Sequence, residues 1–120
     1  MRQRATAVVI RNGKVLLVKD KGHPSFSLPG GKINSNEPTI SAAAREPREE
    51  LGLNVANIER RREADFKGSL SQHRVCLAEV DNEPRIRGHE LDRYRWWDMR
   101  EQVQIYEHVK PILGELGNFI

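Results

Sequence analysis

The chain has 120 residues, of which 38% are hydrophobic and 31% are charged, and its formal net charge is +3. This length predicts one domain, residues 1–120, with a core of its own. Acidic and basic residues alternate locally, as in Glu59-Arg60-Arg61-Arg62-Glu63, whereas a dedicated nucleic-acid binder gathers its basic residues on one face. The composition therefore argues against nucleic acid as the main partner and is compatible with a small anionic molecule.

The sequence also shows no signal for export or for a membrane. No segment approaches the ~20 apolar residues of a membrane span, and the apolar run near the N-terminus is too short for a signal peptide. The one cysteine, Cys76, cannot form an internal disulfide, so we expect a reducing compartment and a cytoplasmic protein. Because Cys76 lies in an apolar, strand-like segment, we interpret it as a buried thiol.

The first predicted elements form a hairpin. Residues 4–10 and 14–20 are rich in Val, Leu and Ile, and Asn12-Gly13 between them suits a tight turn with positive φ angles. Residues 21–38 are dense in Gly, Pro, Ser and Asn, which predicts a loop with a short strand at residues 26–28.

Residues 39–51 are the strongest helix candidate. Ala, Arg and Glu favour a helix, Pro38 suits the first turn, and Gly52 suits the C-cap. Pro47 conflicts with this prediction, because a proline in a helix interior removes one backbone hydrogen bond and costs ~3 kcal/mol. The segment is therefore a regular helix, a kinked helix or no helix at all.

Two strands are predicted next, over residues 53–68 and 71–81, with a turn near residues 67–69. Residues 82–92 predict a loop, and residues 93–99 predict a final strand.

The C-terminal part predicts helical structure. Asp98 is a candidate cap for a short helix, with Glu101 three residues later. Residues 105–116 have helical periodicity, and Pro111 marks either a kink or a helix start. The order of elements predicts an α/β or α+β sandwich built on a mixed sheet.

Three glutamates of the predicted helix, Glu46, Glu49 and Glu50, share one face because they are spaced i, i+3 and i+4. A solvated acidic stripe is the simplest interpretation, and a site for a hard divalent cation is the sharper one. Arg45 is placed to hold one of these carboxylates or to pair with Glu37. The opposite, apolar face is expected to contact the core, which leaves the acids outside; its residues are Ile40, Ala43, Ala44, Pro47 and Leu51.

Residues 31–53, GKINSNEPTISAAAREPREELGL, resemble a Nudix box. The family pattern is Gly, five residues, Glu, seven residues, then Arg-Glu-hydrophobic-any-Glu-Glu-any-Gly-hydrophobic. Pro47 alone departs from the pattern; the matching residues are Gly31, Glu37, Arg45, Glu46, Glu49, Glu50, Gly52 and Leu53. The segments FSLPGG (26–31) and HELDRYRWWDM (89–99) also resemble family segments, so the resemblance extends from the first hairpin to about Met99.

The resemblance implies a Nudix-type α/β/α sandwich with a mixed β-sheet, in which a catalytic helix follows a Gly-rich loop. It also implies hydrolysis of a nucleoside diphosphate linked to another group, with Mg²⁺ or Mn²⁺ as cofactor. By this resemblance Arg45 orients the site, and Glu46 either binds metal or deprotonates water. The implied metal ligands are the Gly30 carbonyl, Glu46, Glu49, Glu50 and Glu90, with His89 and Asp92 as weaker candidates, and the structural positions are Gly31, Glu37 and Gly52.

The substrate is less specified than the family. Small members of this MutT-like kind imply a nucleoside triphosphate pyrophosphohydrolase, which releases a nucleoside monophosphate and pyrophosphate. Open alternatives are ADP-ribose, a dinucleoside polyphosphate or another nucleotide derivative, or a Nudix-fold nucleotide-binding protein in which Pro47 impairs catalysis. Phe26, Phe66 and Tyr94 are candidates to stack on a base, although core or rim positions are the simpler interpretation. A homodimer is expected only by analogy with the family.

Arginines 60–62 are a further candidate for phosphate contact. Alternate residues of a strand face opposite ways, so a solvated face is the simpler interpretation of this run.

Overall fold

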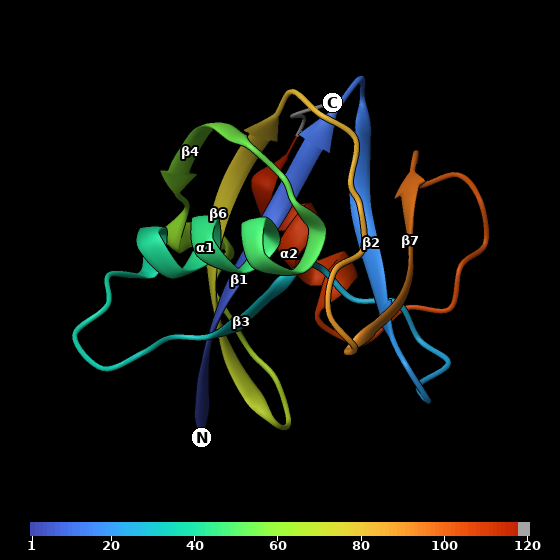
Figure 1. Ribbon diagram of the computed structural model, residues 1–120. Helices are drawn as coiled ribbons and strands as arrows, with labels where there is room; N and C mark the ends of the chain where they lie inside the picture. The colour runs from blue at the N-terminus through green and yellow to red at the C-terminus, as the bar shows by residue number, and fades with distance from the viewer. Residues whose placement is uncertain (118–120) are drawn as a thin grey trace.

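The structure is a computed structural model, and it describes residues 1–117. The elements follow one another in the order strand, strand, strand, helix, strands, helix (Figure 1). The strands are β1 (Arg2–Arg11), β2 (Lys14–Asp20), β3 (Gly30–Lys32), β4 (Val55–Arg60), β5 (Phe66–Lys67), β6 (Ser71–Val80) and β7 (Leu91–Trp97). The helices are α1 (Thr39–Leu51), the short 3-10 helix η1 (Arg62–Ala64) and α2 (Val109–Leu116).

The described strands form one seven-stranded mixed sheet with the order β4-β6-β1-β2-β7, and β3 and β5 pair with β1 and β6. The predicted hairpin is confirmed, since β1 and β2 are antiparallel and Asn12 and Gly13 between them have φ angles of 52° and 75°. β1 and β6 run parallel, with α1 in the connection between them. The remaining pairings are antiparallel, so the predicted mixed sheet is confirmed.

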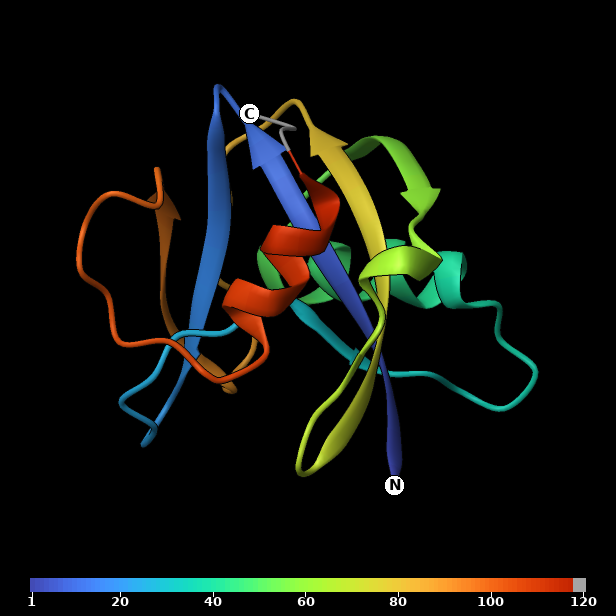
Figure 2. The same cartoon turned by 180° about the vertical axis from the view of Figure 1, so that it is seen from behind.

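One helix covers each face of the sheet. α1 lies in front of the strands in Figure 1, and α2 lies in front when the molecule is turned by 180° in Figure 2. The core accordingly divides into two clusters, one containing Ala42, Ala43 and Leu51 of α1 and the other containing residues of α2. This arrangement is the predicted α/β/α sandwich. Cys76 is fully buried under α1, as the sequence predicted.

Helix α1 runs over the predicted residues without interruption, and it includes Pro47. Pro38 precedes it as the N-cap, and Gly52 ends it at a φ of 63°, with its N–H donating to the Arg48 carbonyl. Of the predicted core face, Ala43, Pro47 and Leu51 are buried, Ala44 is half-buried, and the prediction for Ile40 is wrong because it is 40% exposed. Ile40 lies at the start of the helix, beyond the part that rests on the sheet; the buried residue that the pattern missed is Ala42.

Two predicted strands differ in the structure. Within the predicted strand 26–28, only Phe26 and Ser27 make isolated bridges, and the strand of this loop is β3, which starts at Gly30. The predicted strand 53–68 is broken by η1, because Ala64 turns into the core against α2. Asp65 fixes this turn, since its carboxylate accepts hydrogen bonds from the Arg60 guanidinium and from the Val75 N–H.

Of the predictions for the C-terminal part, the helix after Asp98 is wrong and the helix that contains Pro111 is present. Asp98 does not cap a helix, because its carboxylate accepts the Arg100 N–H two residues later and Met99 has a φ of 70°. Glu101 pairs with Arg95 instead of closing a capping box. Pro111 lies in the first turn of α2, so it marks a helix start. Among residues 1–117, no helix has the length and apolar character needed to cross a membrane.

Candidate active site

Arg45 joins the loop before α1 to the helix itself. Its guanidinium donates to both carboxylate oxygens of Glu37, at 2.8 and 3.0 Å, and to the carbonyl of Lys32 at 3.1 Å. It also donates to Glu46 at 2.9 Å and to Glu49 at 3.4 Å. The hydrogen bonds that Arg45 donates to Glu37, followed by the one that it donates to Glu46, raise the pKa of Arg45 above its ordinary value. Arg45 and Glu37 therefore pair as the sequence predicted, and they fix the loop relative to α1.

The Gly-rich turn lets Glu46 lie directly against the backbone of β3. A Cβ atom on Gly31 would lie 2.5 to 2.8 Å from the three carboxyl atoms of Glu46, which is closer than side chains approach. Gly30 has a φ of 154°, and a Cβ on it would collide with the Ala5 carbonyl oxygen. The two glycines are therefore required by close approach, and Glu46 faces β3 instead of solvent.

Glu50 lies in a cavity of about 310 Å³ that we call the acidic cavity. Its walls include Gly30, the carboxylates of Asp20, Glu46, Glu50 and Glu90, and three cations, Arg2, Arg4 and Lys32. Burial first, and then the charge of Glu46, a hydrogen bond with Glu46 and the charge of Glu90, raise the pKa of Glu50 to about 8. Arg4 opposes this shift. The predicted outward acidic face is therefore wrong for Glu46 and Glu50, while Glu49 is exposed.

The loop before β7 contributes Glu90 to the acidic cavity. The backbone N–H groups of Arg85 and Arg87 donate to the carbonyls of Leu51 and Glu50, each at 2.8 Å. These two bonds attach the loop to the end of α1 and bring Glu90 to the acidic cavity. A neighbouring cavity of about 280 Å³, the loop cavity, is lined by Glu46, Glu49, Glu50, Arg87, Gly88, His89 and Glu90.

Other predicted residues lie elsewhere. Asp92 pairs with Lys19 at 2.9 Å and does not line either acidic region. Phe26 is 9% exposed and belongs to the core cluster on the α2 side, and the half-buried Phe66 packs against this cluster. Tyr94 is half-buried and donates its hydroxyl to Glu83 at 2.9 Å. None of the three aromatic side chains lines the acidic cavity or the loop cavity.

The sequence reasoning missed the cations that line the two cavities, which are Arg2, Arg4 and Lys32 in the acidic cavity and Arg87 in the loop cavity. Arg4 reaches the acidic cavity because β1 pairs with β3, which aligns Arg4 with Lys32. Arg87 reaches the loop cavity because its own N–H binds the end of α1. Neither position follows from spacing in the sequence, because both depend on long-range pairing.

The donor set fits a hard divalent cation. Carboxylates and a backbone carbonyl are the ligands that Mg²⁺ prefers. Burial is the main cause of the raised pKa of Glu50, and the charges of Glu46 and Glu90 add to it, so a bound cation would relieve their repulsion. Within residues 1–117, no three His, Cys, Asp or Glu side chains already converge on a point as metal ligands would. Binding would therefore require side-chain rotation, which the exposure of Glu49 and Glu90 permits.

The sandwich, the Gly-rich turn and the acidic helix together define a Nudix-type protein. The chain belongs to the Nudix family, since the family model described as "NUDIX domain" matches residues 1–113. The solved MutT NUDIX hydrolase from Burkholderia pseudomallei is similar to it, with 26% identity, a TM-score of 0.81, and coverage of 96% of this chain and 97% of that one.

Two curated relatives match parts of the sequence. An mRNA-decapping enzyme subunit 2 from Saccharomyces cerevisiae is 30% identical over 105 residues, which is 82% of this chain and 11% of that protein. A putative 8-oxo-dGTP diphosphatase from Bacillus subtilis is 42% identical over 55 residues, which is 45% of this chain and 37% of that protein. The chain thus spans a minor part of the length of these curated relatives.

Proposed function

We propose that the chain is a Mg²⁺-dependent nucleotide pyrophosphohydrolase, with Mn²⁺ as an alternative metal. Its preferred reaction would convert a nucleoside triphosphate to a nucleoside monophosphate and pyrophosphate. The acidic cavity supports this proposal most directly, because Glu46, Glu50, Glu90 and the Gly30 backbone line one small space. The relatives named above as hydrolases or diphosphatases support the same class of reaction.

The metal would be held by the Gly30 carbonyl and by Glu46, Glu49, Glu50 and Glu90. When bound, it would neutralise phosphate charge and lower the pKa of attacking water. Arg45 orients Glu46 through the hydrogen bond of 2.9 Å, so Glu46 has a fixed position from which to bind metal or accept a proton from water. Gly31, Glu37 and Gly52 would shape the turn and the helix end on which these carboxylates depend.

Besides Arg2 and Lys32, Arg4 and Arg87 bring positive charge to this acidic site. Arg4 lines the acidic cavity and Arg87 lines the loop cavity, so each is placed to contact a phosphate group beside the carboxylates. A guanidinium binds phosphate through two parallel hydrogen bonds, which fixes the orientation of the group. We include both residues in the proposed binding site.

The nucleoside triphosphate assignment is supported by the relative named as an 8-oxo-dGTP diphosphatase. The match to the decapping enzyme favours a second candidate, a nucleotide linked through a polyphosphate bridge. The catalytically impaired alternative also remains testable, because Pro47 lies inside α1 between Glu46 and Glu49. For the base, Phe26, Phe66 and Tyr94 stay as predictions, and their packing favours core or rim roles.

A substrate panel tests the activity. Nucleoside triphosphates, 8-oxo-dGTP, ADP-ribose, a dinucleoside polyphosphate and a cap analogue would each be incubated with Mg²⁺, and phosphate or pyrophosphate release would be measured. We expect turnover of a triphosphate, its loss with a metal chelator, and a fall of at least about 10²-fold with Glu50→Gln. Glu115→Gln, on the exposed face of α2, is the matched control and should leave turnover unchanged.

Two outcomes would contradict the proposal. Retained nucleotide binding without turnover of any substrate would identify a binding protein. Unchanged turnover in Glu50→Gln would show that the acidic cavity is not the metal site.

We further propose that the chain forms a single domain and works as a homodimer. The single sheet with a core cluster on each face supports the first statement. The dimer rests on family analogy, and light scattering coupled to gel filtration tests it, since a monomer mass at micromolar concentration would reject it.

A further inference from the structure

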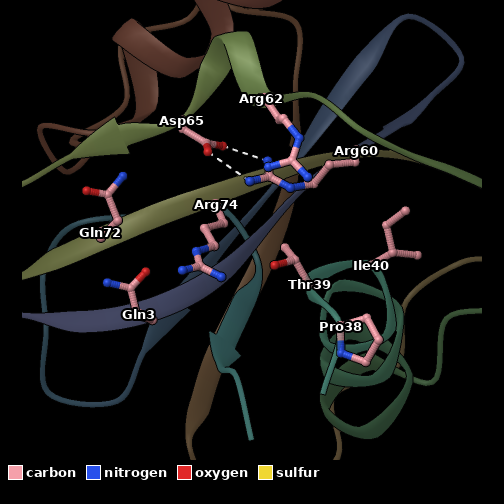
Figure 3. A pocket seen from close by; sticks show the side chains of 9 residues that line it. All are labelled: Gln3, Pro38, Thr39, Ile40, Arg60, Arg62, Asp65, Gln72 and Arg74. Atoms are coloured by element: carbon pink, nitrogen blue, oxygen red, sulfur yellow. Dashed lines mark hydrogen bonds and ion pairs between the residues drawn. The ribbon is translucent and has the colours of Figure 1, made fainter. Parts of the chain in front are cut away.

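A third cavity lies at the start of α1, at the other end of the helix from Glu50 (Figure 3). Its volume is about 750 Å³, and we call it the arginine cavity. Arg60, Arg62 and Arg74 line it together with Gln3, Gln72 and the first residues of α1. In Figure 3 the arginines and glutamines come from the strands and η1, and the start of α1 forms the opposite wall.

α1 lies across β1 and β6 (Figure 1), and the cavity lies beside its first turn, over the first residues of these two strands. Ala5 and Cys76 lie on the sheet face that α1 covers, and both are fully buried. Strand residues two apart share a face, so Gln3 and Arg74 point to the same side. The register pairs Gln3 with Gln72 and Ala5 with Arg74. The first turn of α1 lies beside these polar residues and does not cover them, so they line an open cavity.

The charges in the cavity are not balanced. Asp65 holds Arg60 through two hydrogen bonds of 2.7 and 2.8 Å, so this arginine already has its carboxylate. The ion pairs within residues 1–117 do not include Arg62 or Arg74, and both residues are exposed. The cavity lining therefore carries a net charge of +2, which comes from Arg62 and Arg74.

Arg61 shows that the pairing is selective. It does not line the cavity, and its guanidinium pairs with Glu59 at 2.8 Å and with Glu63 at 2.7 Å. Of the three consecutive arginines, Arg61 is therefore neutralised outside the cavity, whereas Arg60 and Arg62 line it. Arg60 is paired with Asp65, and Arg62 has no carboxylate partner in the described part of the chain. A uniformly solvated face would not separate in this way.

We propose that the arginine cavity binds a nucleoside phosphate as a second ligand site, apart from the acidic cavity. Arg62 and Arg74 would hold the phosphate, because a guanidinium donates two parallel hydrogen bonds to its oxygens. The amides of Gln3 and Gln72 offer both donors and acceptors to a base or sugar. Ile40, 40% exposed at the start of α1, supplies an apolar surface for the base.

The surroundings favour a free nucleotide over a nucleic-acid strand. The cavity volume lies within the roughly 300–1,000 Å³ typical of small-ligand sites. Glu59 and Glu63 flank the arginines and are exposed, and Arg61 neutralises only one of their two charges, so they would repel the further phosphates of a strand.

Titration with AMP in a metal chelator tests this site, because AMP has no anhydride bond to hydrolyse and the chelator keeps metal from the acidic cavity. Binding would be followed by NMR signals of the arginine and glutamine side chains. We expect Arg62→Gln and Arg74→Gln each to weaken AMP binding by about tenfold, as for loss of a charge-assisted hydrogen bond. Arg61→Gln is the matched control, since it removes the same charge from the adjacent position outside the cavity.

The outcomes separate this proposal from the proposed activity, because no turnover is measured. Loss of binding in the two cavity variants, with wild-type affinity in Arg61→Gln, would support the site. Equal weakening in all three variants, or no AMP binding at millimolar concentration, would overturn it. Much tighter binding of a 5′-phosphorylated oligonucleotide than of AMP at the same signals would also overturn it, because the ligand would then be a strand.

Discussion

Gly31→Ala tests the proposed role of Glu46 without altering a charged group. The added Cβ would lie 2.5 to 2.8 Å from the Glu46 carboxyl atoms, whereas carbon atoms in contact normally lie about 3.5–4.0 Å apart. The carboxyl group must therefore move by about 1 Å, and a displacement of that size can lower activity by about 10²-fold. The hydrogen bond of 2.9 Å from Arg45 would also lengthen or break.

The folded state should change less than the activity. Gly31 does not have the left-handed φ that would strain an alanine, and the clash is with the end of a flexible side chain. We expect the free energy of unfolding to fall by less than about 1 kcal/mol, which is the usual size of one lost hydrogen bond. Urea unfolding would measure this change, and steady-state kinetics with the best substrate would measure kcat/KM.

Gly114→Ala provides the control for this experiment. Gly114 lies in α2 with no atom within 4 Å of an added Cβ, so alanine should raise stability by about 0.5–1 kcal/mol and leave kcat/KM unchanged. An unchanged kcat/KM in Gly31→Ala would refute the positional role of Glu46. A large loss of stability would show instead that the Glu46 carboxyl cannot move.

Three further predictions concern stability. Pro47→Ala should raise the free energy of unfolding in urea by about 1–2 kcal/mol, because regaining the helical N–H is worth ~3 kcal/mol and losing buried ring carbons offsets about half of that; equal or lower stability would show that this turn is not a regular helix interior. His73 and His108 are buried and stacked with ring centroids 4.1 Å apart, and burial lowers their pKa values to about 4 and about 3 from 6.5. The unfolded chain therefore binds more protons below about pH 6.5, so the free energy of unfolding should fall progressively between that pH and about pH 4, with each histidine contributing on the order of 1.4 kcal/mol for every step of one in pH; unfolding curves of His73→Gln/His108→Gln with the same pH slope as the wild type would contradict this. Arg45→Lys should lower stability by about 1–2 kcal/mol because lysine cannot keep the two-oxygen contact with a carboxylate, whereas Arg48→Lys on the exposed face is the control, and equal effects would disprove the role of the Arg45 contacts.

Local sequence signals predicted the elements whose conformation depends on neighbouring residues. The Asn12-Gly13 turn and the Gly52 C-cap need positive φ angles, and glycine or asparagine at those positions supplies them. The prediction of one strand over residues 53–68 was wrong because two of its residues make contacts distant in the sequence. Asp65 accepts the Val75 N–H, and Ala64 packs in the core with α2. The predicted helix after Asp98 is wrong because the Asp98 carboxylate accepts the N–H of Arg100, only two residues later. A capping pattern in the sequence does not distinguish this turn from a helix cap.

In the candidate site, too, contacts within one stretch of sequence were predicted, and contacts between distant segments were not. The spacing of Glu37 and Arg45 predicted their contact, because both belong to one contiguous motif. The direction in which Glu46 and Glu50 point was predicted wrongly, since the helical pattern does not reveal that β3 and the loop before β7 lie over the acidic side. The arginine cavity did not follow from the sequence either, because it depends on where α1 begins relative to β1 and β6.

These contacts explain how α1 can contain Pro47 and still present its carboxylates. A helix end normally leaves its last carbonyls unpaired, but here the N–H groups of Gly52, Leu53, Arg85 and Arg87 bind carbonyls of residues 47–51. The loop that supplies the Arg85 and Arg87 N–H groups also carries Glu90. The same two hydrogen bonds therefore stabilise the end of α1 and bring Glu90 to the acidic cavity. Upstream of Pro47, Arg45 binds the loop before the helix on the other side. The turn that contains Pro47 is thus fixed from both sides by tertiary contacts, and the bond that proline removes is not the one that positions Glu46 or Glu50.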